Sequence, residues 1–425
     1  MSHGAKAVIR FCATLKLAIG ITSLSWKHRS DQRISAVQGP VILNQRTPPS
    51  PIPFLRPRPA RLSRLVRELE AIEDSGHFSN YGPVNTRLEA ALTAEIFGGV
   101  GGCLTVNNAT SGLMIAIREA VPLSDKRRYA LMPSFTFAAT AHAAMWVGLT
   151  PLFCDIDSAT WNACPDAENL LLDMYGDQIA CIVPYACFGN CIDLDRYARI
   201  GRDRSIGIVV DAAASLGSLD AAGRGFGAGF PHAVVYSMHA TKTFATGEAG
   251  VIHCGDSERL ARLRLMGNFG FGEPRRATMP GLNSKLSEVA ALLGLAKLEG
   301  FPELVDHRDT LATTYRENLP DMTFQKVVGR RLAYQFMPAL LPPFNAPQRP
   351  HILRQLAEEG IGTASYFSPH LMQQPFFAAH CLSGSLSRTD HVAERVISLP
   401  MSDEMTATEI LRICRALRAI LEANA

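Results

Sequence analysis

The sequence predicts an α/β fold with a large, mostly parallel sheet and a smaller α/β region toward the C-terminus. Beyond Gly102, short apolar runs rich in Val and Ile alternate with helical segments, which is typical of a parallel sheet buried on both faces. A second, shorter set of such segments follows Gly300. With 425 residues, 47% hydrophobic and 19% charged, the chain is long enough for two packed parts. We therefore expect a large domain over residues 53–300 and a small domain over residues 301–425.

The beginning of the chain is unusually basic. About a dozen Lys and Arg and a single acid, Asp31, lie between Met1 and Arg67. An apolar stretch at residues 7–26 is interrupted by basic residues, so it falls short of the roughly 20 apolar residues that a bilayer requires. We interpret residues 1–52 as a basic, poorly ordered N-terminal extension, with a targeting leader as the alternative, and we expect no membrane association.

Charge and cysteine content bear on partners and compartment. A net charge of +3 gives no reason to expect nucleic acid as a partner. The ten cysteines are scattered and lack the close pairs of a zinc ribbon or finger. We expect reduced, buried thiols in a cytoplasmic protein, and no metal site.

The predicted elements can be followed along the chain. Helical spacing starts at about Leu62, and a second helix fits residues 84–97. Six strand-like runs follow: Tyr129–Met132, Pro151–Asp155, Ile179–Pro184, Ile206–Val210, Ala233–Tyr236 and Val251–His253. The later region contains a strand-like run over residues 332–341 and helices over residues 352–359 and 406–423. Because ligands bind beyond the carboxyl ends of parallel strands, residues just after each run are candidates for function.

Three segments after predicted strands or before helices can carry chemistry. Asp211 follows a buried run, where a carboxylate either caps the next helix or pairs with a protonated ring nitrogen. Lys242 lies in a turn rich in Ser, Thr and Gly, and it is either a solvated loop residue or an amine that forms an imine with an aldehyde. Thr110 and Ser111 precede a helical pattern, where they either cap the helix or bind phosphate.

Together these segments appear in one order with spacing that resembles a known family. The matching segments are NNATSGL at Asn107, PSFTFAATAHAAMWVGLTPLFCDID at Pro133, VVDAAASLGS at Val209, YSMHATKTFATGEAGVI at Tyr236 and GLNSKLSEVAALLGLAKLE at Gly281. From roughly Pro53 to Leu417 the chain resembles the DegT/StrS-type nucleotide-sugar aminotransferases, which are fold type I enzymes that depend on pyridoxal 5'-phosphate (PLP). The lysine segment and the Pro133 segment are specific to that family, whereas the phosphate turn alone is not.

The resemblance implies a role for each matched residue. Lys242 corresponds to the lysine that forms a Schiff base with the cofactor, Asp211 to the partner of the pyridine nitrogen, and Phe137 to the aromatic residue stacked on the ring. Phosphate-binding positions are matched by Thr110, Ser111 and Ser237 and, from the other subunit, by Asn283. The last correspondence implies a homodimer.

The sequence departs from the family pattern at three positions near these motifs. Ala214 stands where the family often has Gln, Ala186 where many relatives have His, and Lys285 where many have Arg. The side chain of Ala214 cannot make the cofactor contact of the family's Gln. Each of the three changes either alters sugar specificity or marks a subgroup of the family. None of them removes Lys242 or Asp211.

By the same resemblance, the reaction is transfer of an amino group from glutamate to a nucleotide-linked keto sugar. A 4-keto-6-deoxyhexose is favoured and a 3-keto sugar is the next choice. The alternatives are a PLP-dependent sugar dehydratase, whose family members have His in place of Lys242, and a noncatalytic regulator or sensor. A dinucleotide-binding oxidoreductase is disfavoured because no Gly-x-Gly-x-x-Gly follows a first strand.

Overall fold

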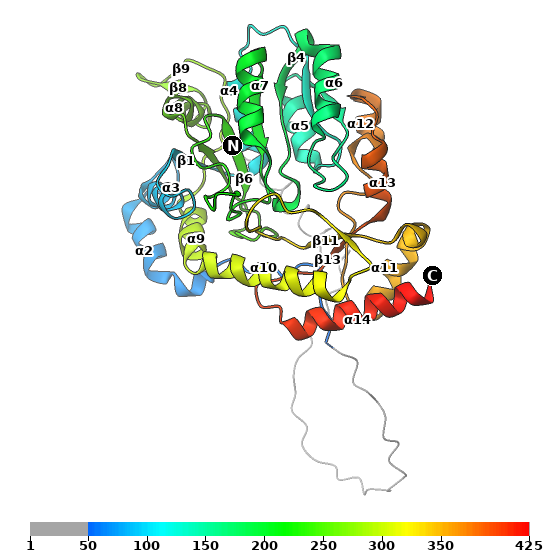
Figure 1. Cartoon of the computed structure of the whole chain (residues 1–425). Helices are drawn as coiled ribbons and strands as arrows, with labels where there is room; N and C mark the ends of the chain where they lie inside the picture. The colour runs from blue at the N-terminus through cyan, green and yellow to red at the C-terminus, as the bar shows by residue number, and fades with distance from the viewer. Residues whose placement is uncertain (1–49, 425) are drawn as a thin grey trace, which may run out of the picture. The chain divides into compact units, whose positions relative to one another are not determined.

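The computed structural model describes residues 50–424, so almost all of the predicted basic extension lies outside the described residues. Their centre is an eight-stranded sheet in the order β1-β7-β6-β5-β4-β2-β3-β12 (Figure 1). Its strands are β1 (Gly102–Val106), β2 (Tyr129–Pro133), β3 (Thr150–Cys154), β4 (Ile179–Ile182), β5 (Gly207–Asp211), β6 (Ala233–Ser237), β7 (Gly250–Cys254) and β12 (Leu382–Ser383). Only β7 runs antiparallel to its neighbours β1 and β6. The predicted α/β class and mostly parallel sheet are confirmed.

The six predicted strands correspond to β2 through β7, with ends that differ by no more than about two residues. Strand β1 was not predicted. It is five residues long, follows a run of glycines and carries Thr105 among its apolar residues, so its pattern is weak. It is placed by its pairing with β7, which no local pattern can reveal.

Alternate residues of the strands enter two different hydrophobic clusters, one on each face of the sheet. Ile208 and Val210 of β5 belong to one cluster and Val209 to the other, as the two-residue period of a strand requires. The first face is covered by α3 (Pro83–Glu95), α6 (Pro165–Tyr175), α7 (Leu194–Arg204) and α9 (Glu288–Leu298). The second is covered by α4 (Ala109–Ala120), α5 (Ala138–Trp146), α8 (Ser257–Met266) and α12 (Pro375–His380).

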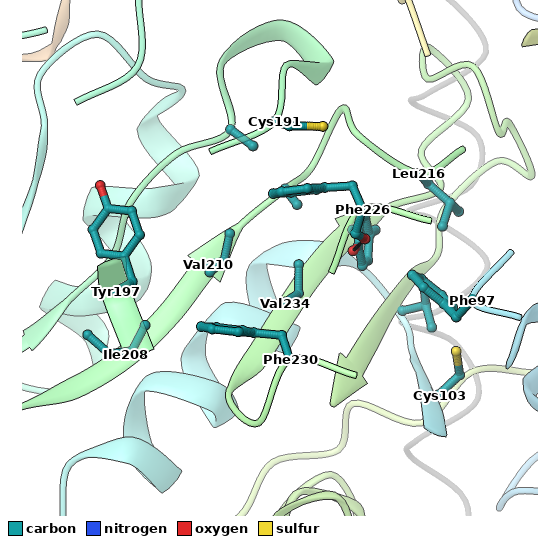
Figure 2. Close-up of a cluster of buried hydrophobic side chains, with 14 of the residues drawn as sticks. Phe97, Cys103, Cys191, Tyr197, Ile208, Val210, Leu216, Phe226, Phe230 and Val234 are labelled. Carbon is teal, nitrogen blue, oxygen red and sulfur yellow. Dashed lines mark hydrogen bonds between the residues drawn. The ribbon is translucent and has the colours of Figure 1, made fainter. Parts of the chain in front are cut away.

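Figure 2 shows part of the first cluster, where Val210 and Val234 from neighbouring strands lie near the ring of Phe226. Each fully buried side chain of this size contributes about 1.5–3 kcal/mol to stability before the cost of ordering the chain. A sheet packed on both faces therefore gives the strand ends a rigid support.

A second core lies in the C-terminal region. It is formed by α10 (Phe301–Asn318), α11 (Arg349–Glu358), α14 (Ala407–Ala423) and an antiparallel sheet of β10 (Thr323–Phe324), β11 (Met337–Leu340) and β13 (Val396–Leu399). Helices α10 and α14 lie side by side in Figure 1. Helix α10 also inserts Phe301 and Val305 into the core of the large sheet. The division into two domains near residue 300 stays a prediction.

Some peripheral elements differ in extent from the predicted ones. The first helical segment is a short 3-10 turn, Leu62–Arg64, followed by α2 (Val66–Ser75). The predicted strand over residues 332–341 begins only at Met337, because the carbonyl groups of Ala333 and Tyr334 accept hydrogen bonds from side chains rather than from a strand. The remaining α-helix is α13 (Ser387–Arg395), and β8 (Phe271–Gly272) and β9 (Arg276–Ala277) form a hairpin. Further 3-10 turns lie at Gly176–Gln178, Cys187–Gly189, Pro343–Gln348 and Leu371–Gln373. Within residues 50–424, no helix has the length and apolar content needed to span a bilayer.

The antiparallel course of β7 matters for the position of Lys242. Ser237 ends β6 and pairs with Gly250, which begins β7, so both residues lie at the edge where the parallel strands end. The chain between them leaves and re-enters the sheet at this one edge, and Lys242 lies on that loop. Asp211 ends β5, the next strand of the sheet.

Candidate active site

Asp211 is a buried carboxylate at the end of β5, with 2% of its surface exposed. Its Oδ2 accepts a hydrogen bond from Thr140 Oγ1 at 2.5 Å, and its Oδ1 accepts one from the backbone N–H of Ala213 at 3.0 Å. Burial raises the pKa of Asp211, while Thr140, Ala213 and the charge of Lys242 act in the opposite direction. A carboxylate has about four acceptor positions, and these two donors occupy two of them. The group can therefore accept a further, cationic donor.

Lys242 is surrounded by protein although part of its surface is accessible. Its Nζ donates a hydrogen bond to Gln335 Oε1 at 3.0 Å. Burial lowers the pKa of Lys242 from 10.5 to about 8, and Asp211 acts in the opposite direction. An amine with this pKa is partly deprotonated near neutral pH, which is the form that reacts with a carbonyl carbon.

The two groups lie close enough for each charge to act on the pKa of the other. They reach this position from neighbouring strands: Asp211 pairs with Val235 in β6, and Lys242 lies on the loop that follows β6. Arg308 of α10 lines the same cleft as Ala240, Thr241 and Lys242 of this loop. An acid and an amine are thus both directed to one sheet edge.

The predicted phosphate turn forms the start of α4. Thr110 and Ser111 lie in its first turn, and Asn108 caps the helix by accepting a hydrogen bond from the N–H of Ser111 at 2.9 Å. The N–H groups of Ala109 and Thr110 have no partner within the helix, as at any helix start. Backbone N–H groups and hydroxyl groups together attract phosphate.

Ser237 approaches this turn through Gly250. Gly250 pairs with Ser237 of β6 on one side and with Val106 of β1, just before the turn, on the other. A Cβ atom at Gly250 would lie 2.8 Å from Ala109 N and 3.0 Å from Asn108 C, so only glycine allows this close approach. The structure thus brings the three predicted phosphate residues of this chain to one place.

Phe137 is the residue before α5, and 57% of its surface is exposed. Its ring lies 6.4 Å from that of Phe367, at the edge of an aromatic cluster that includes Phe188 and Tyr366. Thr140, which donates to Asp211, follows one turn later on the same helix. A large exposed aromatic ring, one turn before a residue that hydrogen-bonds to the carboxylate, can serve as a platform for a flat ligand.

Asn283 is exposed, and its Oδ1 accepts a hydrogen bond from Lys285 Nζ at 2.6 Å. No contact joins it to Asp211 or Lys242 within the described chain. Its neighbour Ser284 accepts a hydrogen bond from the N–H of Asn107 at 2.7 Å. The segment with Asn283 therefore packs beside the phosphate turn of its own chain. Its predicted reach into a second subunit stays a prediction.

The departures from the family pattern lie within or beside this edge. Ala186 is buried, and its N–H donates to the carbonyl of Asp211 at 2.8 Å. Ala214 is also buried, three residues after Asp211. Lys285 lies over the ring of Phe269 at 4.6 Å from the ring centre. The two alanines leave the surroundings of Asp211 less polar than the Gln and His of the family pattern would.

The sequence analysis did not identify three residues that position the site. Thr140 orients the Asp211 carboxylate, Gly250 admits the phosphate turn, and Gln335 contacts Lys242. Thr140 follows Phe137 in the long family-like segment and could have been noticed there. Gln335 is 93 residues from Lys242, and no local signal connects them. Among residues 50–424, no cluster of His, Cys, Asp or Glu fits a metal ion.

His370 follows Phe367 by three residues and is buried, with 1% of its surface exposed. Its Nε2 donates to Asp390 Oδ1 at 2.9 Å, because a carboxylate oxygen accepts, and its Nδ1 lies 2.8 Å from Ser134 Oγ. Both ring nitrogens are occupied, so His370 anchors the segment beside Phe367 and does not contact substrate.

The donor set fits PLP. A cationic ring nitrogen would complete the hydrogen bonds of Asp211, the amine of Lys242 suits the aldehyde, and the start of α4 with Ser237 suits the phosphate. Gly250 provides the space that a Cβ would fill.

The family comparison decides the assignment, since a family model for the DegT/DnrJ/EryC1/StrS aminotransferases matches residues 61–418. The chain belongs to this family. It is accordingly a PLP-dependent sugar aminotransferase, and the family resemblance of its motifs is confirmed.

Individual relatives of this aminotransferase agree. The dTDP-4-amino-4,6-dideoxy-D-glucose transaminase of Shigella dysenteriae is 29% identical over 377 residues, which cover 87% of this chain and 99% of the relative. A protein from Bacillus cereus ATCC 10987 described as a PLP-dependent aminotransferase superimposes with a TM-score of 0.82 at 35% identity, over 87% of this chain and all of the other. DesI, solved in the presence of its TDP-sugar product, gives a TM-score of 0.77 at 30% identity, and the match covers 90% of this chain and 95% of DesI.

Proposed function

We propose that this sugar aminotransferase moves an amino group from glutamate to the C4 keto group of a nucleotide-linked 4-keto-6-deoxyhexose. The observation that carries the proposal is the convergence of a buried acid and a desolvated amine, Asp211 and Lys242, at one sheet edge beside a phosphate turn. The C4 position is supported by the relative from Shigella dysenteriae, which is named for a 4-amino-4,6-dideoxy sugar. A 3-keto sugar is the second choice.

Each side chain has a defined task in this proposal. When PLP is bound, it supplies an electron sink for the carbanion that forms at the amino carbon. Ionised Asp211 would pair with the ring nitrogen and favour its protonated form. Lys242 would hold the aldehyde, and its free amine, with a pKa of about 8, can accept and return a proton at Nζ near neutral pH. Thr110, Ser111 and Ser237 would hold the phosphate, and Phe137 would support the ring.

The assembly and compartment are also proposals. Asn283 is exposed, so it is available to a second copy of the chain, and we propose a homodimer in which it contacts the phosphate of the partner. All nine cysteines of the described part are free and buried, which supports a reducing, cytoplasmic compartment.

A transamination screen tests the function. The protein, loaded with PLP, is incubated with glutamate and with nucleotide-linked 4-keto and 3-keto hexoses, and amino sugar and 2-oxoglutarate are measured by mass spectrometry. We expect turnover of a 4-keto-6-deoxyhexose and none with Lys242→Ala. Turnover of only 3-keto sugars would contradict the C4 assignment and indicate that the enzyme aminates C3.

The same screen separates the other reaction classes. Loss of water from the sugar without amine formation would indicate a dehydratase, and PLP binding without any turnover would indicate a sensor. Transfer between free amino acids alone would contradict the sugar acceptor.

A further inference from the structure

We propose that Gln335 is a positioning residue for the amine of Lys242, which holds Nζ whenever this amine is not bonded to the cofactor. The proposal rests on the role given to Lys242 above. It begins with one contact: the Lys242 Nζ donates to Gln335 Oε1 at 3.0 Å. While this amine is protonated it can only donate, so the amide oxygen is the group that faces the charged lysine.

The backbone that carries Gln335 is fixed to the loop that carries Lys242. Thr243, the next residue after the lysine, donates from its hydroxyl to the carbonyl groups of Ala333 at 3.1 Å and Tyr334 at 3.0 Å. Ser218 Oγ accepts the N–H of Ala333 at 3.0 Å. These hydrogen bonds connect the lysine loop to the glutamine segment, so the distance between the Lys242 amine and the Gln335 amide is held nearly constant.

A largely buried ion cluster supports the segment from the other side. Arg308 of α10 donates to the carbonyl groups of Tyr334 at 2.7 Å and Gln335 at 3.3 Å. The same guanidinium pairs with Asp403, which also accepts from Lys297 Nζ at 2.8 Å. Burial opposes ionisation of Asp403, but Arg308 and Lys297 outweigh it and hold its pKa below the usual value. Arg308 and its partners thus bind the backbone of this segment, and the group that contacts the amine is the neutral amide of Gln335.

A neutral acceptor suits an amine that must exchange a proton. A carboxylate at this distance would stabilise the ammonium form and raise the pKa of the lysine, whereas an amide oxygen orients Nζ with a much smaller effect. The charged groups around the same narrow cleft are Arg56 and Arg58 of the N-terminal arm, with Arg308 and Asp403, while Asp211 acts from β5. The neutral side chain of Gln335 lines the same cleft and directly contacts Nζ.

The test measures the titration of Lys242 in the PLP-free full chain, where turnover plays no part. Reductive methylation of Lys242 is followed by peptide mass spectrometry from pH 6 to 11 in wild type, Gln335→Glu and Gln335→Met. We expect the wild-type midpoint near pH 8, a higher midpoint for Gln335→Glu and a lower one for Gln335→Met, because the hydrogen bond favours the charged form. The matched control is Gln178→Met, since Gln178 contacts Arg128 and is remote from the lysine.

Kinetics of the loaded enzyme add a second readout. The bleaching of the cofactor absorbance by the amino donor should slow by about tenfold or more in Gln335→Met, with donor affinity little changed. Thermal unfolding and PLP content identify a variant that fails to fold. Unchanged midpoints in both Gln335 variants would overturn the inference. Full activity in Lys242→Ala would instead contradict the proposed function.

Discussion

At the scale of single residues, the site depends on two titratable groups whose pKa values burial shifts toward their neutral forms. Burial raises the pKa of Asp211 and lowers that of Lys242, so each is moved toward neutrality. The hydrogen bonds from Thr140 and Ala213 keep the acid available as an anion, and Gln335 orients the amine. Burial thus prepares both groups for a ligand that carries a positive nitrogen and an aldehyde.

Replacing Asp211 by Asn should remove the charge that keeps the ring nitrogen protonated. We expect kcat/KM to fall by at least about a hundredfold, the usual cost of losing one preorganised electrostatic partner. Thr140→Val removes only one donor to the carboxylate and should cost about tenfold or less. Steady-state kinetics with saturating PLP measure both. Equal losses in the two variants would contradict the role of Asp211 as a charged partner.

His253 predicts a weakness in acid. It is buried, stacks on Phe97 with ring centres 3.9 Å apart, and accepts the N–H of Gly229. Burial lowers its pKa from 6.5 to about 4, so the fold favours neutral imidazole. This stability is fully present above pH 6.5 and is lost as the pH falls toward 4, on the order of 3 kcal/mol in all. Urea unfolding of His253→Gln should show a shallower decline over this window.

Exposed His351 provides the control for that experiment. His351→Gln should retain the wild-type slope. An unchanged slope in His253→Gln would assign the acid sensitivity to other groups, of which His232, with its pKa also lowered to about 4, is the first to test.

At the scale of elements, the phosphate site depends on how closely β7 approaches the start of α4. Gly250→Ala would place a Cβ against the backbone of Asn108, Ala109 and Tyr236, none of which can move independently. We expect a loss of about 1–3 kcal/mol in the free energy of unfolding and PLP binding weakened by about tenfold or more. Chemical denaturation and fluorescence titration with PLP measure the two effects.

Gly176→Ala is the matched control, because a Cβ there lies 3.6 Å from the flexible end of Arg204. Its effect on stability should stay within about 0.5 kcal/mol. Normal PLP affinity in Gly250→Ala would show that the start of α4 does not hold the phosphate.

At the scale of the whole molecule, a homodimer with shared sites makes a sharp prediction. Lys242→Ala and Asn283→Ala proteins are unfolded, mixed and refolded together. If Asn283 serves the site of the partner, each mixed dimer contains one site with both residues intact and one with neither. About a quarter of wild-type activity should then return. No recovery above the sum of the parents would place Asn283 in its own subunit.

The reach of sequence reasoning is clearest from particular residues. Asp211 could be placed because an apolar run before it marks a buried strand and the edge where such strands end is where ligands bind. Strand β1 and the late start of β11 could not be predicted, since pairing with β7 fixes the first and the side chains of Thr243 and Arg308 fix the second. Gln335 was missed for the same reason: its contact with Lys242 joins distant segments.

The return of the chain at β7 has a consequence for how such an enzyme can change over generations. Because the loop after Ser237 starts and ends at the same border of the sheet, changes of length inside it leave the pairing of β6 with β7 intact. The sheet is therefore protected from such changes in the loop that carries Lys242. Substitutions within this loop can alter its chemistry while the strands that support it keep their pairing.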